Sequence, residues 1–159
     1  MLDRPSATHI AHVNRGILRY GWNDPRSHGF TQAIEAVNKL AERSPGFVWR
    51  HGNELQPSRT LPFFDGNPNA AMTFSVWESV PALEAFVYKT VHGAFFKRRS
   101  EWFLPSDEPN YALWSIPAGI VPDFVEADAR LKALIANGPT KDVFDFSYWR
   151  QHMAEQETI

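Results

Sequence analysis

The sequence contains no cysteine in its 159 residues. That absence excludes disulfides, thiolate metal sites, cysteine nucleophiles and thiolate-ligated heme. It is compatible with a reducing compartment, and we expect a cytoplasmic protein. No apolar run approaches the roughly 20 residues that a membrane helix needs. The first residues also lack the basic and then apolar pattern of a secretory signal. No association with a membrane is therefore expected.

The sequence also has little excess of charge of either sign, because its formal net charge is only −2. Nucleic-acid binding therefore gets no electrostatic support. The six histidines show no H-x-x-x-H or H-E-x-x-H spacing, so no metal site is expected from a local motif. A glycine-rich phosphate loop, a nucleophile elbow and a paired-carboxylate motif are absent too. What the sequence has is aromatic residues: 12 Phe, 6 Trp and 4 Tyr. They suit a large core or a pocket for a small apolar or aromatic molecule.

Hydrophobic periodicity predicts the secondary structure. The expected strands are residues 8–20, 47–52, 70–79 and 111–119, and the expected helices are residues 30–43, 79 to about 103, and 125–136. Ser79 is the expected N-cap of the second helix, which has a glycine, and so a potential bend, at Gly93. Alternation in the first strand places His12 and Asn14 on one face. A C-terminal extension begins near residue 140, and residues 142–149 are expected to form a terminal strand or an extended arm.

The order of these elements is strand, helix, strand, strand, helix, strand. It predicts a single α+β domain over residues 1–159, with a ferredoxin-like split βαβ arrangement and an antiparallel sheet. We expect the helices to cover one face of this sheet. Because aromatic residues occur on both faces, the second face also needs a cover. A second copy of the chain packed face to face would provide it, so a homodimer is expected.

Three sequence blocks carry a resemblance to a known family. They are SPGFVWR at 44–50, SVWESVPALEAFVYKTVHGAFFKRRSEWF at 75–103 and ALWSIPAG at 112–119. In this order they resemble the family of domains of unknown function numbered 3291, from about residue 9 to residue 146. The resemblance implies the dimeric α+β barrel superfamily, which is similar to antibiotic-biosynthesis and heme-degrading monooxygenases and to chlorite dismutases. The family has no single established chemistry, so the resemblance bears more on the fold than on the function.

His92 is the first candidate for chemistry, on the helix expected to end near residue 103. Tyr88 and Phe96 lie one turn away on either side of it, as expected contacts of a substrate. Its imidazole could ligate heme iron, as helix histidines do in several relatives, or act as a general acid or base. It could equally be a packed residue that hydrogen-bonds a carbonyl. The cofactor is therefore left open, with heme as one candidate.

Polar residues in apolar strands give further candidates. Asn14 and Arg50 could orient a substrate carbonyl or carboxylate, since a guanidinium presents a fork suited to anions. Some relatives with the implied fold oxidise aromatic substrates without a cofactor, using tryptophan and asparagine side chains. Asn14 with Trp49 or Trp77 would make such a set, and Trp114 is a further candidate for substrate contact. The alternative for the tryptophans is packing in the core or the dimer interface, and for Arg50 it is solvent at the dimer rim.

The sequence thus predicts a small monooxygenase-like oxidoreductase that acts on an apolar or aromatic small molecule, with or without heme. Two alternatives stay open. One is a non-catalytic dimer that binds heme or a small molecule. The other is an isomerase or dehydratase that works by acid–base chemistry at His92.

Overall fold

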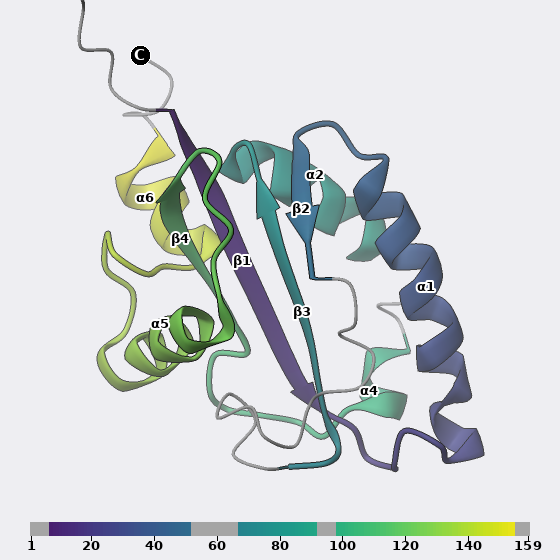
Figure 1. The fold of residues 1–159 in the computed structure, drawn as a ribbon. Helices are drawn as coiled ribbons and strands as arrows, with labels where there is room; N and C mark the ends of the chain where they lie inside the picture. The colour runs from purple at the N-terminus through teal and green to yellow at the C-terminus, as the bar shows by residue number, and fades with distance from the viewer. Residues whose placement is uncertain (1–6, 52–66, 92–97, 155–159) are drawn as a thin grey trace, which may run out of the picture.

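Four strands form one antiparallel sheet in a computed structural model that describes residues 7–51, 67–91 and 98–154. The strands are β1 (Thr8–Ile17), β2 (Phe47–Arg50), β3 (Ala70–Trp77) and β4 (Tyr111–Pro117). Their order across the sheet is β2-β3-β1-β4, so the first and third strands lie at its centre (Figure 1). This order, with a helix after β1 and another after β3, confirms the predicted ferredoxin-like α+β fold.

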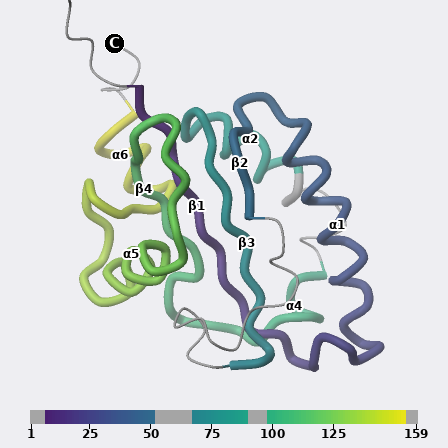
Figure 2. The backbone as a smooth tube through the Cα atoms, in the orientation of Figure 1, coloured from purple at the N-terminus to yellow at the C-terminus, as the bar shows by residue number. Residues whose placement is uncertain are grey.

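Helices lie on both faces of the sheet, which corrects the expectation of helices on one face only. The helical elements are η1 (Pro25–Ser27), α1 (His28–Glu42), α2 (Val80–Val91), α4 (Arg99–Trp102), α5 (Phe124–Asn137) and α6 (Phe146–His152). Figures 1 and 2 show α5 on the opposite side of the sheet from α2. The chain's own α5 therefore covers part of the face that we expected a second subunit to cover.

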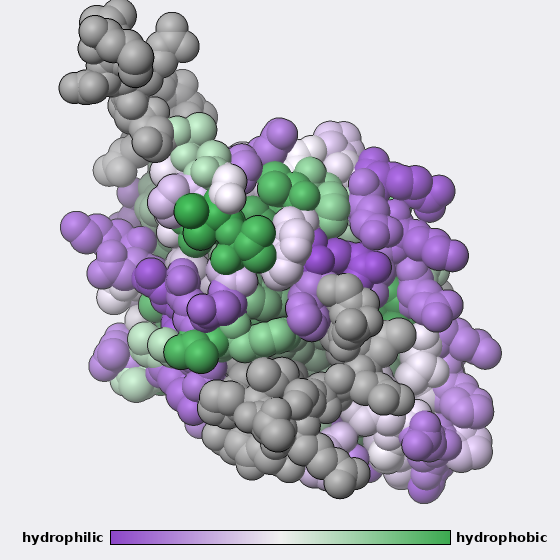
Figure 3. Space-filling model, in the orientation of Figure 1, coloured by the Kyte–Doolittle hydropathy of each residue, from purple (hydrophilic) through white to green (hydrophobic). Residues whose placement is uncertain are grey.

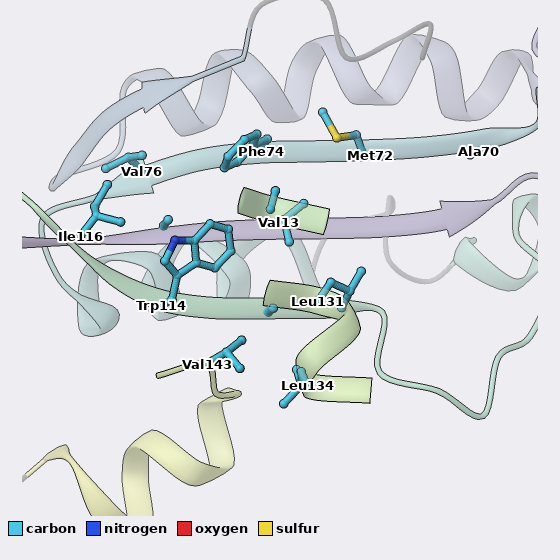
Figure 4. Packing of buried hydrophobic residues seen from close by; sticks show 13 residues of the cluster. Val13, Ala70, Met72, Phe74, Val76, Trp114, Ile116, Leu131, Leu134 and Val143 are labelled. Carbon is cyan, nitrogen blue, oxygen red and sulfur yellow. The ribbon is translucent and has the colours of Figure 1, made fainter. Parts of the chain in front are cut away.

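One face of the sheet, which we call the packed face, lies against α5. Its core contains Val13 of β1, Phe74 of β3, Trp114 of β4 and Leu131 of α5. Figure 4 shows these side chains meeting between the strands and the helix. Phe74 and Trp114 are each at most 1% exposed. Burial of that much aromatic and aliphatic surface makes this layer a major contributor to stability.

The opposite face, which we call the cavity face, lies against α1, α2 and α6. Near β2 and α6 it is filled by a buried cluster that includes Trp77, Leu83 and Trp149. At the other end of the sheet a separate cluster contains Phe30 of α1 and Phe103. Residues of β1 alternate between the two faces as the sequence predicted, because successive side chains of a strand point in opposite directions.

The segment after β3 begins as predicted. Ser79 caps α2, and its Oγ accepts a hydrogen bond of 3.2 Å from the backbone N–H of Ala82. The single helix expected up to about residue 103 is wrong in part, because Arg98 is a non-helical cap and α4 is a separate short helix; residues 92–97 between α2 and this cap lie outside the described residues. The Trp102 carbonyl in α4 accepts a hydrogen bond of 2.8 Å from the backbone N–H of Arg19. This bond fixes α4 to the end of β1.

The C-terminal extension also differs from the prediction. Only the residues around Phe144 are extended, and Phe144 pairs with Leu113 of β4 through two backbone hydrogen bonds of 2.9 Å. The chain then forms α6 instead of a strand. Asp145 caps this helix, since its carboxylate accepts from the Tyr148 N–H at 2.8 Å. The predicted strand was wrong because the aromatic residues here follow a helix cap, which outweighs their strand propensity.

Candidate functional site

A cavity of about 310 Å³ lies between the cavity face of the sheet and helices α1 and α2. We call it the inner cavity. The side chains of α1 and α2 that line it are apolar: Phe30, Ile34, Val37, Phe86 and Val87. The strands contribute the polar side chains His12, Asn14, Thr73 and Tyr111. An apolar cavity with a few convergent polar groups is the usual form of a small-molecule site.

The register of the sheet brings the polar groups together. Asn14 of β1 lies opposite Thr73 of β3 on one side and opposite Tyr111 of β4 on the other. The three residues form one row across the sheet. His12 lies two residues before Asn14 on the same face, roughly 6.6 Å along the strand. A ligand of a few rings over this part of the sheet would contact all four side chains.

His12 is the most perturbed titratable group of the cavity. Its side chain is buried, with 8% exposure, and the loss of solvent lowers the pKa of its imidazole to about 4. The imidazole is therefore neutral at neutral pH. Its ring centroid lies 6.1 Å from that of Tyr111. Within the part of the chain that the structure describes, no side chain or backbone group hydrogen-bonds the ring. A nitrogen of a neutral imidazole is available as a proton acceptor.

Tyr111 is held in place from two sides. Its hydroxyl oxygen accepts a hydrogen bond of 3.1 Å from the backbone N–H of Phe146, at the start of α6. Burial raises the pKa of this phenol, so the hydroxyl keeps its proton at neutral pH. Because the oxygen already accepts, the O–H is available to donate to a ligand.

A second, larger hollow of about 660 Å³ adjoins the inner cavity, and we call it the outer cleft. Its lining includes Arg15, Arg19 and Glu108. Four residues line both spaces: Gly16, Arg99, Phe103 and Asn110. The two spaces therefore meet where the end of β1 contacts α4.

Glycine is required at this boundary because the Phe103 ring lies directly on the strand. A Cβ atom placed on Gly16 would come within 2.6 Å of the Phe103 Cδ1 atom. Real Cβ atoms do not approach other atoms that closely, so any side chain at position 16 would displace the ring. The close approach of ring and backbone thus shapes the floor between the two spaces.

The predicted site residues lie in different parts of the molecule. Asn14 lines the inner cavity. Trp77 is on the same face but fully buried outside the cavity, where its Nε1 donates to Ser75 Oγ at 3.0 Å. Trp49 and Trp114 pack on the opposite face. The Trp114 Nε1 donates to Glu126 Oε1 at 2.8 Å, so the polar N–H of this buried indole has a partner. Trp114 therefore acts as a packed core residue.

Two predicted site residues, Arg50 and Tyr88, do not line the inner cavity. Arg50 pairs with Glu42 at 3.3 Å near the edge of the sheet. The Tyr88 side chain is 65% exposed. His92 and Phe96 lie outside the described residues, so their roles in catalysis, heme ligation or substrate contact stay predictions.

His12 is the cavity residue that the sequence reasoning missed as a functional group. The signal was present, because strand alternation placed His12 beside Asn14 on one face. His12 has no metal-ligand spacing to another histidine and does not lie on a helix, so neither of those sequence criteria selects it. Within residues 7–51, 67–91 and 98–154, no three metal-ligating side chains come together.

The family model described as "Domain of unknown function (DUF3291)" matches residues 9–158. The chain belongs to this family. The predicted family is thus confirmed over nearly all of the sequence of this DUF3291 protein. No curated protein gives a significant match. None of the helices in the described part of this DUF3291 chain has the length and apolar character needed to cross a membrane.

Solved structures with a similar arrangement have low sequence identity to the DUF3291 chain. A conserved protein from Methanosarcina mazei Go1 has 12% identity and a TM-score of 0.49, covering 70% of this chain and 93% of its own. SnoaB, a cofactor-independent oxygenase from Streptomyces nogalater, has 15% identity and a TM-score of 0.46, covering 74% and 100%. NE2512, a protein of unknown function from Nitrosomonas europaea, has 11% identity and a TM-score of 0.47, covering 75% and 99%. Resemblance at this level carries no inference about activity.

Proposed function

We propose that the chain is a small monooxygenase-like oxidoreductase that oxidises an aromatic or apolar molecule in the inner cavity. The observation that carries this proposal is a buried, neutral His12 beside Asn14, in a cavity whose lining from α1 and α2 is apolar. Burial keeps this imidazole unprotonated but makes it a weaker base, so proton removal from a C–H or O–H group there depends on the substrate anion stabilising the imidazolium. In this proposal Asn14 keeps its predicted role of orienting the substrate, and His12 takes the role of base.

The acid–base step uses three side chains. His12 accepts the proton, and the anion left on the substrate would stabilise the resulting imidazolium. The side-chain amide of Asn14 and the hydroxyl of Tyr111 can donate hydrogen bonds to the oxygen on which negative charge develops. These donors are fixed by the strand register and by the Phe146 N–H, so they need little reorganisation.

The anion is the electron-rich form of the substrate that molecular oxygen oxidises. For a methylene group activated by neighbouring aromatic rings, one O2 converts CH2 to C=O and releases one water. The substrate supplies all four electrons, one oxygen atom enters the product, and no external reductant is needed. The protein's part is proton removal and the exclusion of bulk water.

Heme suits the described cavity less well. A volume of about 310 Å³ lies at the low end of the range for small-ligand sites. It suits a molecule of two or three fused rings better than a four-pyrrole macrocycle. The test is an absorption spectrum with added hemin, for which we expect no shifted Soret band.

The main experiment separates proton removal from oxidation. Purified protein is incubated with polycyclic phenols and diaryl ketones that carry an acidic methylene, and oxygen uptake and product mass are measured. In deuterated buffer without oxygen, we expect the methylene to exchange its hydrogen, and the His12→Gln variant to lose both exchange and oxygen uptake. Exchange without oxygen uptake in air would favour the isomerase or dehydratase alternative. Binding with neither would favour a non-catalytic dimer or carrier.

We also propose that the active form is a homodimer. Apolar side chains are exposed beside the packed face at Ile120 (54%), Val121 (60%) and Val125 (68%). Figure 3 shows hydrophobic side chains gathered over the β4–α5 loop and the start of α5. Contiguous exposed apolar surface of this kind favours association. A second copy would then extend the cover that α5 provides, and the inner cavity would lie on the far side of each sheet.

A further inference from the structure

Arg99, at the boundary between the inner cavity and the outer cleft, differs from the other arginines of this region. Its guanidinium carbon lies 5.1 Å from the centroid of the Phe103 ring. Its side chain is half-buried, and the loss of solvent lowers the pKa of the guanidinium. Within the described residues no carboxylate or carbonyl pairs with it. A desolvated cation without an anionic partner is unfavourable, so this group is suited to receive an anion.

The neighbouring arginines show the contrast. Arg98 pairs with Glu101 at 2.8 Å, and Arg19 donates through its Nε to the Ser100 carbonyl at 2.8 Å. Each of these cations is therefore already engaged within the chain. Arg99 follows Arg98 directly, yet it lines both hollows and has no acceptor among the described residues.

The position of Arg99 is fixed by the backbone on both sides of α4. Its carbonyl accepts from the Phe103 N–H at 3.0 Å, and the Leu104 N–H donates to Ile17 at 2.9 Å. The Phe103 ring beneath the guanidinium is itself held against Gly16. A planar guanidinium held on an aromatic ring is a pre-organised partner for a planar carboxylate, which it can bind through two parallel hydrogen bonds.

We propose that the substrate is an aromatic carboxylate. Its ring system occupies the inner cavity over His12 and Asn14, and its carboxylate binds Arg99 at the boundary with the outer cleft. The inference rests on the proposed function of the inner cavity and adds the charge and shape of the ligand. Arg99 acts as a specificity-determining residue, because it increases the affinity for a ligand that carries an anion at one end and aromatic rings at the other.

The test uses two probes of the same shape, 2-naphthoate and the neutral 2-naphthamide, with binding measured by calorimetry at pH 7.5. We expect the intact protein to bind the carboxylate more tightly by roughly tenfold or more, as for a hydrogen bond to a charged group. Arg99→Gln should remove this preference and leave the affinity for the amide unchanged. Arg98→Gln is the matched control and should keep the preference.

The outcomes separate this proposal from the function on which it rests. If both probes bind with equal affinity, or if Arg98→Gln removes the preference as well, Arg99 is not the carboxylate site, while the cavity remains a ligand site. If neither probe binds, the inner cavity is not a site for aromatic molecules and both proposals fail. Preserved folding of each variant is checked by its thermal unfolding midpoint.

Discussion

The two faces of the sheet are built from the same strands, but one forms a packed core and the other lines a cavity. On the packed face, alternate residues such as Val13, Phe74 and Trp114 fill the space up to α5. On the cavity face, the intervening residues His12, Asn14 and Thr73 lie beneath a hollow. Neighbouring residues of β1 thus belong to the core and to the site in alternation. Stability and ligand chemistry can therefore be changed independently by substituting odd or even positions of one strand.

The largest expected effect comes from opening the packed face. Trp114→Ala removes a fully buried indole and its hydrogen bond to Glu126. We expect a loss of about 3–5 kcal/mol in the free energy of unfolding, measured by urea denaturation. Asn14→Ala on the cavity face is the counterpart and should cost about 1 kcal/mol or less, while reducing turnover. A stable Trp114→Ala variant with impaired ligand binding would instead support the predicted substrate role of Trp114.

The next effect concerns acid stability and depends on His12. Its pKa is about 4 in the folded protein and 6.5 in its unperturbed state. Above pH 6.5 the imidazole is neutral in both the folded and the unfolded state, so its burial adds no pH dependence to the free energy of unfolding. As the pH falls from 6.5 to 4, only the unfolded chain gains the proton, so the folded state loses about 3 kcal/mol of stability.

The measurement is the free energy of unfolding at pH 7.5 and pH 4.5 for the intact protein and for His12→Gln. The variant should lose less stability over this interval, and His28→Gln, which changes an exposed histidine, should behave like the intact protein. Tyr111 and Arg99, the other titratable side chains described as lining the inner cavity, change charge at much higher pH. Equal losses in all three proteins would mean that His12 is not desolvated and would weaken its assignment as the base.

A smaller effect is expected at the boundary between cavity and cleft. Gly16→Ala would place a methyl group 2.6 Å from Phe103 Cδ1, so the ring must move. We expect a loss of about 1–3 kcal/mol in stability, together with weaker binding of 2-naphthoate, because the ring supports Arg99. Gly21→Ala is the matched control, since its added methyl would meet only Asn69 Oδ1 at 4.0 Å. Unchanged naphthoate affinity in Gly16→Ala would show that the ring does not position the guanidinium.

The sequence predicted the fold well where local signals and burial agree. Strand alternation assigned Val13 and His12 to opposite faces, and the Ser79 cap located the start of α2. It failed at α6, because the cap at Asp145 competes with a run of aromatic residues that also suits a strand. The arrangement of the sheet's second face was missed as well, since amphipathic periodicity in α5 does not say which face of a sheet the helix covers.

The site was predicted only in part, because it is formed by contacts between distant segments. Asn14 was chosen as a polar residue in an apolar strand, and it lines the cavity. The low pKa of His12 arises from burial on the cavity face, and no short motif encodes that. In the sequence, Arg99 is one residue of a basic triplet and nothing distinguishes it. In the structure, it is distinguished by its contact with Phe103 and by the lack of a described acidic partner. Tertiary environment, not residue type, distinguishes these groups.

The smallest effect on stability separates assembly from binding. Val121 is 60% exposed in the β4–α5 loop, so Val121→Lys should change the free energy of unfolding of one chain by less than about 0.5 kcal/mol. If the packed face carries the homodimer interface, the charge should shift the mass measured by light scattering from dimer to monomer. Val48→Lys, at a 39% exposed position of β2, tests whether the interface extends to the sheet edge.

Because the inner cavity opens on the other face, naphthoate binding should survive in a monomeric variant. Loss of binding together with the dimer would mean that the second copy helps to form the cavity, and the two faces would then be functionally coupled.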